Sequence, residues 1–186
     1  MVLSNRPSAK ALERARTAGV PAFALSQKRF ESLPERDLAF VEQLRAHQVD
    51  LVVLAGYDRV LSAEFPQAFP ERVINTHPSL LPAFGGHSAV APKPQADAVA
   101  YGCKIAGCSV QFVLDDGGVD TGPIIAQAAV PVYDDDTVDS LVRRILRKEH
   151  RILLDAIRWI AEGRVRLEGR RVLTGQLRPS DEHMVP

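Results

Sequence analysis

The sequence predicts an α/β fold with a mostly parallel sheet flanked by helices. Helical and strand-like patterns alternate along its first half, which is typical of doubly wound sheets. Residues 51–55 are continuously apolar and end at Gly56, as expected for a parallel strand buried on both faces. Apolar residues then recur at spacings of three and four between Thr137 and Gly163, so one long helix is expected to close the domain.

Capping residues mark the first two helices. Ser8 stands at the N-cap and Gly19 at the C-terminal end of an expected helix. Ser32 and Glu35 have the spacing of a capping box, which predicts a second helix ending near Gln48. The remaining strands are expected over residues 20–25, 72–75, 109–114 and 124–132.

The composition is that of an ordinary globular domain. Of the 186 residues, 46% are hydrophobic and 25% are charged. The 23 basic and 23 acidic side chains cancel, so general attraction to nucleic acid or to an anionic membrane is not expected. We expect one domain over residues 1–175 and a polar tail over residues 176–186.

Two further features bear on the cellular compartment. The sequence contains no apolar run long enough to span a membrane and no N-terminal secretory signal, so the expected location is cytoplasmic. Cys103 and Cys108 have no second pair of cysteines elsewhere, and we expect them to be reduced thiols.

The densest polar cluster lies at the end of the strand expected over residues 72–75. If the strand continues, Asn75 and His77 project from the same face, at the carboxyl end where open sheets bind ligands. An amide can stabilise a developing oxyanion while an imidazole handles a proton. The alternative is that His77 is a structural histidine of the core.

A second polar cluster, residues 114–123, connects two expected strands. Asp115 and Asp116 are interpreted as solvated turn formers, whereas Asp120, beside a Thr-Gly-Pro turn, can face inward and pair with a histidine. His87 follows two glycines and is the other histidine that could join the site. Metal ligation by Asp120 and the two histidines lacks a close-spaced ligand pair, so no metal is expected.

The long helix carries two unusual charge features. Glu149 falls inside its apolar stripe, which makes it a candidate site residue because a carboxylate on a packed face is uncommon unless paired or bound. The alternative is an edge residue paired with a nearby arginine. Residues 143–171 hold ten basic and four acidic side chains, which is typical of a solvated face but could also attract phosphate or a polyglutamate tail.

Two motifs together resemble those of the formyltransferase family. The first is Asn-Thr-His-Pro-Ser-Leu-Leu-Pro at residues 75–82, and the second covers residues 119–127. The likeness extends over residues 2–173 and includes residues 54–62 and Glu149. It implies a Rossmann-like formyltransferase fold that transfers a formyl group from 10-formyltetrahydrofolate to the amine of glycinamide ribonucleotide, in purine biosynthesis.

The resemblance also implies roles for individual residues. Asn75 would donate a hydrogen bond to the formyl oxygen as it becomes an oxyanion, and His77 would stabilise the same centre. Asp120 would hold His77 and help to move a proton through water. Glu149 would accept hydrogen bonds from the ribose hydroxyls, and His87 would also contact the ribonucleotide. The implied folate contacts are Tyr57, Asp58, Arg59, Val60, Leu61, Asn75, Val113, Leu114, Asp115 and Asp120.

The sequence departs from the family pattern in several places, among them the start of the chain, Leu33, Asp58, Leu146 and the loop over residues 89–95. Most members begin with a strand and a Gly-Ser-Gly-Ser-Asn type loop that binds the substrate phosphate, whereas residues 2–5 resemble the family's second strand. The first strand, loop and helix are therefore expected to be missing, which places phosphate binding in doubt. The sheet edge left uncovered could be buried against another copy, so a homodimer is a further expectation. Gln111 stands where a histidine is frequent.

Three other functions stay open. A formyltetrahydrofolate deformylase shares the fold and the Asn-His-Asp trio, but it usually has a second histidine where Pro78 stands. A methionyl-tRNA formyltransferase is similar around the trio but would carry an additional C-terminal domain. A non-catalytic folate- or RNA-binding remnant would use the basic helix as its functional surface.

Overall fold

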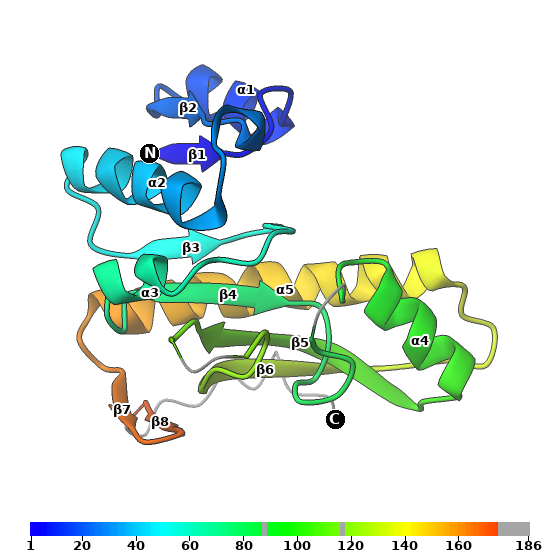
Figure 1. Cartoon of the computed structure of the whole chain (residues 1–186). Coiled ribbons are helices and arrows are strands. Elements are labelled where there is room, and N and C mark those ends of the chain that lie inside the picture. Colours follow the sequence, from blue (N-terminus) through cyan, green and yellow to red (C-terminus); the bar gives the residue numbers. More distant parts are fainter. Residues whose placement is uncertain (87–88, 116–117, 175–186) are drawn as a thin grey trace. The chain divides into compact units, whose positions relative to one another are not determined.

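The computed structural model describes residues 1–86, 89–115 and 118–174 (Figure 1). The chain divides into two compact units. The first comprises Met1–Val52 and Val60–Pro70, and the second comprises Val53–Arg59 and Glu71–Pro186. Among the helices described, none combines the length and the apolar character that a bilayer crossing demands. The polar tail expected over residues 176–186 lies outside the described residues.

The first unit begins with a parallel pair of strands. Strand β1 (Val2–Ser4) pairs with β2 (Ala22–Ala24), and helix α1 (Lys10–Thr17) connects them. The expected cap by Ser8 is wrong, because Ala9 occupies the N-cap and provides no side-chain hydrogen bond. The expectation that a strand, loop and helix are missing before β1 stays a prediction.

Two further helices complete the first unit. Helix α2 (Leu33–Ala46) follows a short 3-10 turn, η1 (Gln27–Arg29), and α3 (Glu64–Ala68) packs against α2. As predicted, Ser32 caps α2 by accepting a hydrogen bond from the backbone N–H of Glu35. The core of this unit is formed by Leu12, Phe40, Val41, Leu44 and Phe65.

The second unit is built on a four-stranded sheet in the order β3-β4-β5-β6. Its strands are β3 (Val52–Leu54), β4 (Val73–His77), β5 (Ile105–Phe112) and β6 (Ile124–Pro131). β5 is antiparallel to both β4 and β6. Except at Ile105, β5 is buried along its whole length, so it forms the middle of the core.

The expectation of a mostly parallel sheet is wrong for β4, β5 and β6, which alternate in direction. Residues 113–123 connect β5 to β6 and are too few for a helical crossover, so the chain reverses instead. A continuous apolar run indicates a strand buried on both faces, but it does not specify the direction of the neighbouring strand. β1 and β2, which a helix connects, are parallel as expected.

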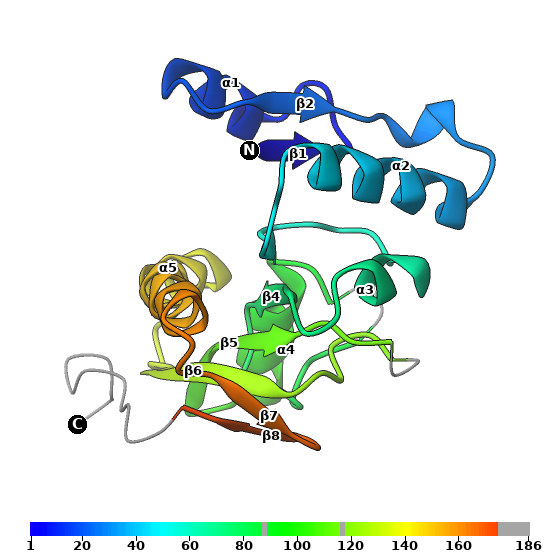
Figure 2. The ribbon, with the colours of Figure 1, turned by 90° about the vertical axis from the view of Figure 1, so that its left-hand side faces the viewer.

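Helix α5 (Val138–Ala161) begins and ends where the sequence predicts. Thr137 and Ser140 form a reciprocal capping box, and Gly163 follows the helix with a φ of +67°. α5 packs along β5 and β6 (Figure 2). The fully buried members of its apolar stripe are Leu141, Ile145, Ile152, Ala156 and Ile160.

Three elements of the second unit were not expected from the sequence. Helix α4 (Lys93–Tyr101) precedes β5, and strands β7 (Arg166–Glu168) and β8 (Arg171–Leu173) form an antiparallel hairpin after α5. α4 has Pro94 in its first turn and Gly102 at its left-handed C-cap, which are ordinary signals for the two ends of a helix. 

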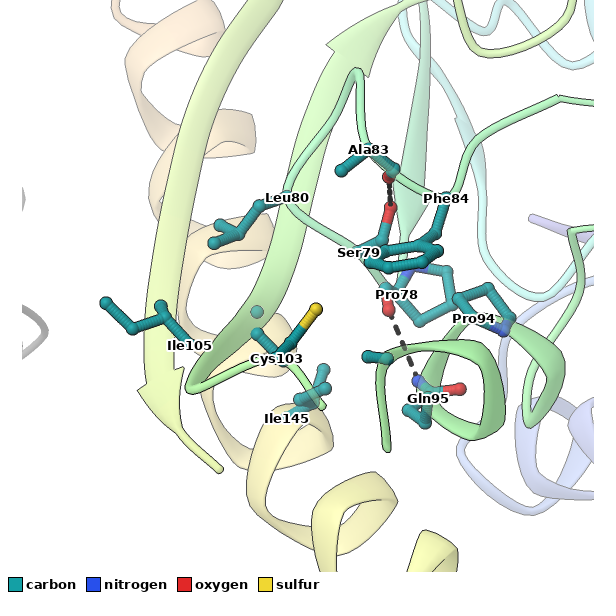
Figure 3. A pocket seen from close by; sticks show the side chains of 13 residues that line it. Pro78, Ser79, Leu80, Ala83, Phe84, Pro94, Gln95, Cys103, Ile105 and Ile145 are labelled. Atoms are coloured by element: carbon teal, nitrogen blue, oxygen red, sulfur yellow. Dashed lines mark hydrogen bonds between the residues drawn. The ribbon is translucent and has the colours of Figure 1, made fainter. Parts of the chain in front are cut away.

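The loop after β4 covers a cavity of about 130 Å³, whose other walls come from α4, β5 and α5 (Figure 3). Several hydrogen bonds hold this loop, and two of them are drawn in Figure 3. Ser79 Oγ donates to the carbonyl of Ala83 over 2.6 Å, and Gln95 Nε2 of α4 donates to the carbonyl of Pro78 over 3.3 Å. The loop is therefore tied both to itself and to α4.

Gly107 of β5 lies so close to β6 that a side chain would not fit. A Cβ there would lie 2.1 Å from the carbonyl oxygen of Ala128 and 2.7 Å from Leu80 Cδ2. We expect Gly107→Ala to lower the free energy of unfolding by about 3 kcal/mol or more, measured by urea denaturation. Ala98→Val, which adds volume beside the cavity, is the matched control and should change it by less than about 1.5 kcal/mol. Equal losses in the two variants would contradict the close packing.

Candidate active site

Strand β4 carries the polar residues that the sequence analysis selected. Asn75 and His77 are two positions apart on β4 and project from one face, as predicted. Thr76 lies between them and projects from the other face, where its hydroxyl donates to Glu149 Oε1 over 3.0 Å. In the antiparallel register, Asn75 lies opposite Gln111 of β5.

Asp120 lies at the centre of a hydrogen-bonded cluster. Its Oδ2 accepts from the backbone N–H of Gly86 over 3.0 Å and lies 3.4 Å from His77 Nδ1. Its Oδ1 accepts from Gln111 Nε2 over 3.1 Å and from Asn75 Nδ2 at the longer distance of 3.5 Å. N–H groups therefore surround both oxygens, an arrangement that suits an ionised carboxylate because that form only accepts. The structure thus brings the predicted trio together.

Each ring nitrogen of His77 faces an oxygen that accepts hydrogen bonds. Nδ1 faces the Asp120 carboxylate, and Nε2 lies 3.2 Å from the carbonyl oxygen of Phe84. The side chains of His77 and Asp120 are only 5% and 8% exposed, so little solvent screens their interaction.

The backbone is strained at both residues that present an oxygen to His77. Phe84 has a φ of +53° and Asp120 a φ of +59°, in the left-handed region that glycine adopts most easily. Such strain persists only where the surrounding structure enforces it, and it concentrates at functional sites. The fold therefore holds both oxygens against the imidazole despite a local backbone penalty.

The arrangement has the groups needed for acyl chemistry. An amide and an imidazole side by side can donate hydrogen bonds to an oxygen that gains negative charge, and a buried carboxylate can accept a proton directly or through water. Within residues 1–86, 89–115 and 118–174, no cluster of three or more His, Cys, Asp or Glu side chains is arranged to hold a metal ion.

Glu149 is held from the opposite side of β4. It is half-buried on α5, and its partner is the Thr76 hydroxyl. In the described part of the chain Glu149 forms no ion pair with an arginine, so the alternative of an arginine-paired edge residue is wrong.

Cys108 of β5 is an unreactive core residue. Burial is the main cause that raises the pKa of its thiol to about 12, and the negative charge of Glu149 raises it further.

Apart from Asn75 and Asp120, the residues expected to contact folate lie in three segments. Tyr57, Asp58 and Arg59 follow β3 in the second unit, where Arg59 Nε lies 3.7 Å from Asp58 Oδ1. The next two residues along the chain belong to the first unit. Val60 is exposed and Leu61 is half-buried.

The third segment follows β5. There the N–H of Val113 donates to the carbonyl of Val73 over 2.8 Å and extends the pairing of β4 with β5. Leu114 is half-buried and Asp115 is exposed. His87 lies outside the described residues.

Three residues that complete the cluster were not predicted from the sequence. Gln111 is 2% exposed and its amide holds Asp120, while Gly86 and Phe84 contribute backbone groups. A polar residue within a buried strand was the available signal for Gln111. Because the sheet was expected to be mostly parallel, the position of Gln111 opposite Asn75 was not foreseen.

Comparison with known proteins places the chain in one family. The model of the formyl transferase family matches residues 1–157. Phosphoribosylglycinamide formyltransferase of Bacillus subtilis is 42% identical over 151 residues, which are 81% of this chain and 74% of that protein. The trifunctional purine biosynthetic protein adenosine-3 of Drosophila melanogaster is 44% identical over 163 residues, which are 88% of this chain and 12% of that protein.

A solved structure agrees in both sequence and fold. Glycinamide ribonucleotide transformylase 1 from Symbiobacterium toebii is 52% identical and superposes with a TM-score of 0.86, covering 92% of this chain and 78% of that one. The chain belongs to the formyl transferase family. Several of its relatives within that family are phosphoribosylglycinamide formyltransferases, which confirms the resemblance found in residues 75–82 and 119–127.

Proposed function

We propose that this chain transfers a formyl group from 10-formyltetrahydrofolate to the amine of glycinamide ribonucleotide, a step of purine biosynthesis. The chief support is the buried cluster of Asn75, His77 and Asp120 in a member of the formyl transferase family. The relatives named for this reaction match most of the chain, which supports the choice of substrates. The finer description of the fold, a Rossmann-like domain over residues 1–175, is part of this proposal.

The reaction needs a site that stabilises an oxyanion. The amine nitrogen attacks the formyl carbon, and the carbonyl electron pair moves onto the formyl oxygen. When that pair returns, the bond from the formyl carbon to the donor nitrogen breaks. The Asn75 amide and a His77 N–H are the groups that stabilise the charged oxygen, because both lie in a poorly solvated cluster where hydrogen bonds to charge are strong.

One proton must also move. The attacking amine loses a proton, and the donor nitrogen gains one as it leaves, so the transfer is balanced without any further reactant. Asp120 accepts and returns this proton through water, while its contacts with Gly86 and Gln111 keep the carboxylate in place. His77, held between Asp120 and Phe84, stays directed at the same centre.

The two ligands are assigned to different residues. The donor's folate contacts Tyr57, Asp58, Arg59, Val60, Leu61, Asn75, Val113, Leu114, Asp115 and Asp120. The ribose hydroxyls of the ribonucleotide donate to Glu149, and His87 contacts the same substrate. No metal takes part. A homodimer and a cytosolic location stay predictions, the former to be tested by light scattering of the purified chain.

The proposed function itself is tested by product analysis of the purified protein. Mass spectrometry should detect formylated glycinamide ribonucleotide formed in step with tetrahydrofolate. Release of formate without formylation of the ribonucleotide would instead identify a deformylase. Absence of both reactions, together with RNA binding that weakens steeply with salt, would favour the non-catalytic alternative.

A further inference from the structure

The first unit contains a fully buried ion pair that the proposed reaction does not use. Arg36 and Asp37 are neighbours near the start of α2, and both side chains are 0% exposed. Arg36 Nε donates to Asp37 Oδ1 over 2.7 Å, and Arg36 Nη2 lies 2.6 Å from the same oxygen. Charges so deeply buried are uncommon, so the pair needs a physical explanation.

Both partners also bond the backbone of one short segment. Arg36 Nη2 donates to the carbonyl of Val60 over 2.8 Å. Asp37 Oδ2 accepts from the N–H of Ser62 over 2.6 Å. These two bonds bracket Leu61, so the pair fixes the backbone on both sides of that residue.

A gain in the stability of the folded state does not by itself explain why such a pair is present. The desolvation of two buried charges offsets most of their attraction, and replacing both partners by apolar residues of similar size is often neutral or stabilising. Moreover, Arg36 Nη1 is buried without a hydrogen-bond partner among the described residues, so the guanidinium is not fully satisfied. What the pair provides uniquely is two directed hydrogen bonds to the segment from Val60 to Ser62.

We infer that Arg36 and Asp37 are positioning residues that fix the folate-binding segment of the enzyme. This inference rests on the proposed function, because Val60 and Leu61 belong to the residues assigned to the folate. The segment lies where the chain re-enters the first unit at Val60, so its conformation depends on anchors of this kind. A loop already held in its binding conformation loses less entropy when the ligand binds.

The test compares folate binding with stability in one double variant. Arg36→Met combined with Asp37→Leu removes both charges and both anchors but leaves no unpaired buried charge. The double variant should unfold at a temperature close to that of the unaltered chain, yet bind tetrahydrofolate roughly tenfold more weakly, as two lost anchors imply. Both quantities are measured on the 186-residue chain, by calorimetry and by thermal unfolding followed by circular dichroism.

A second ion pair serves as the control. Arg144 binds Asp136 through two hydrogen bonds at the start of α5, and neither residue is assigned to a ligand. Arg144→Met with Asp136→Leu should leave tetrahydrofolate affinity unchanged. Unchanged affinity in the Arg36 and Asp37 double variant would overturn the positioning role alone. If the unaltered chain bound no tetrahydrofolate, both the positioning role and the proposed function would be overturned.

Discussion

His77→Ala and Asp120→Asn are each expected to lower formyl transfer by about 10² to 10⁴-fold while leaving the fold intact. The loss arises because His77 touches the reacting centre and Asp120 both holds His77 and moves the proton. Transfer would be measured as kcat/KM. His47→Ala is the matched control, because His47 is an exposed histidine at the C-terminal end of α2 and is not a member of the proposed site. Wild-type turnover in either site variant would remove the proposed site.

The trio was predictable from the sequence because its positions depend on short-range rules. Asn75 and His77 share a face through the two-residue period of a strand, and the turn after Val119 gives Asp120 an inward direction. Those rules hold whether the neighbouring strand is parallel or antiparallel. The three residues therefore lie together as expected even though the expected sheet was wrong, while their roles stay a prediction.

Gln111 depends on strand direction and was missed for that reason. Its contact with Asp120 follows from the antiparallel register that sets it opposite Asn75. Residues such as Val110 and Phe112 show that β5 is buried, but burial is the same beside a parallel or an antiparallel neighbour. Long-range pairing, which local patterns do not encode, decided this part of the site.

Helix α4 was missed because two of its local signals conflict. Pro92 and Pro94 suggest an irregular segment, yet a proline in the first turn of a helix loses no backbone hydrogen bond. Gly102, with a φ of +81°, ends the helix in the conformation that glycine favours. Tertiary packing of Ala98 and Gln95 in the core resolves the conflict in favour of the helix.

Glu149→Gln is expected to weaken binding of glycinamide ribonucleotide by roughly 1.5 to 3 kcal/mol, which is the range for a hydrogen bond to a charged group. The variant keeps the shape of the side chain and an oxygen that can accept from Thr76, so α5 and β4 should stay packed. Only the negative charge that attracts the ribose hydroxyls is lost. Affinity for tetrahydrofolate should stay nearly unchanged, because the folate is assigned to other residues.

The comparison of two ligands separates a binding role for Glu149 from a structural one. Thr76→Val removes the hydrogen bond that orients the carboxylate but leaves its charge, so the ribonucleotide affinity should fall by less than in Glu149→Gln. Calorimetry would measure the affinity for both ligands in both variants. Since Thr76 and Glu149 meet on the face of β4 opposite to Asn75 and His77, a purely structural defect in β4 would disturb both faces. Equal loss of affinity for the two ligands would therefore mean that Glu149 supports the strand and does not bind the ribose.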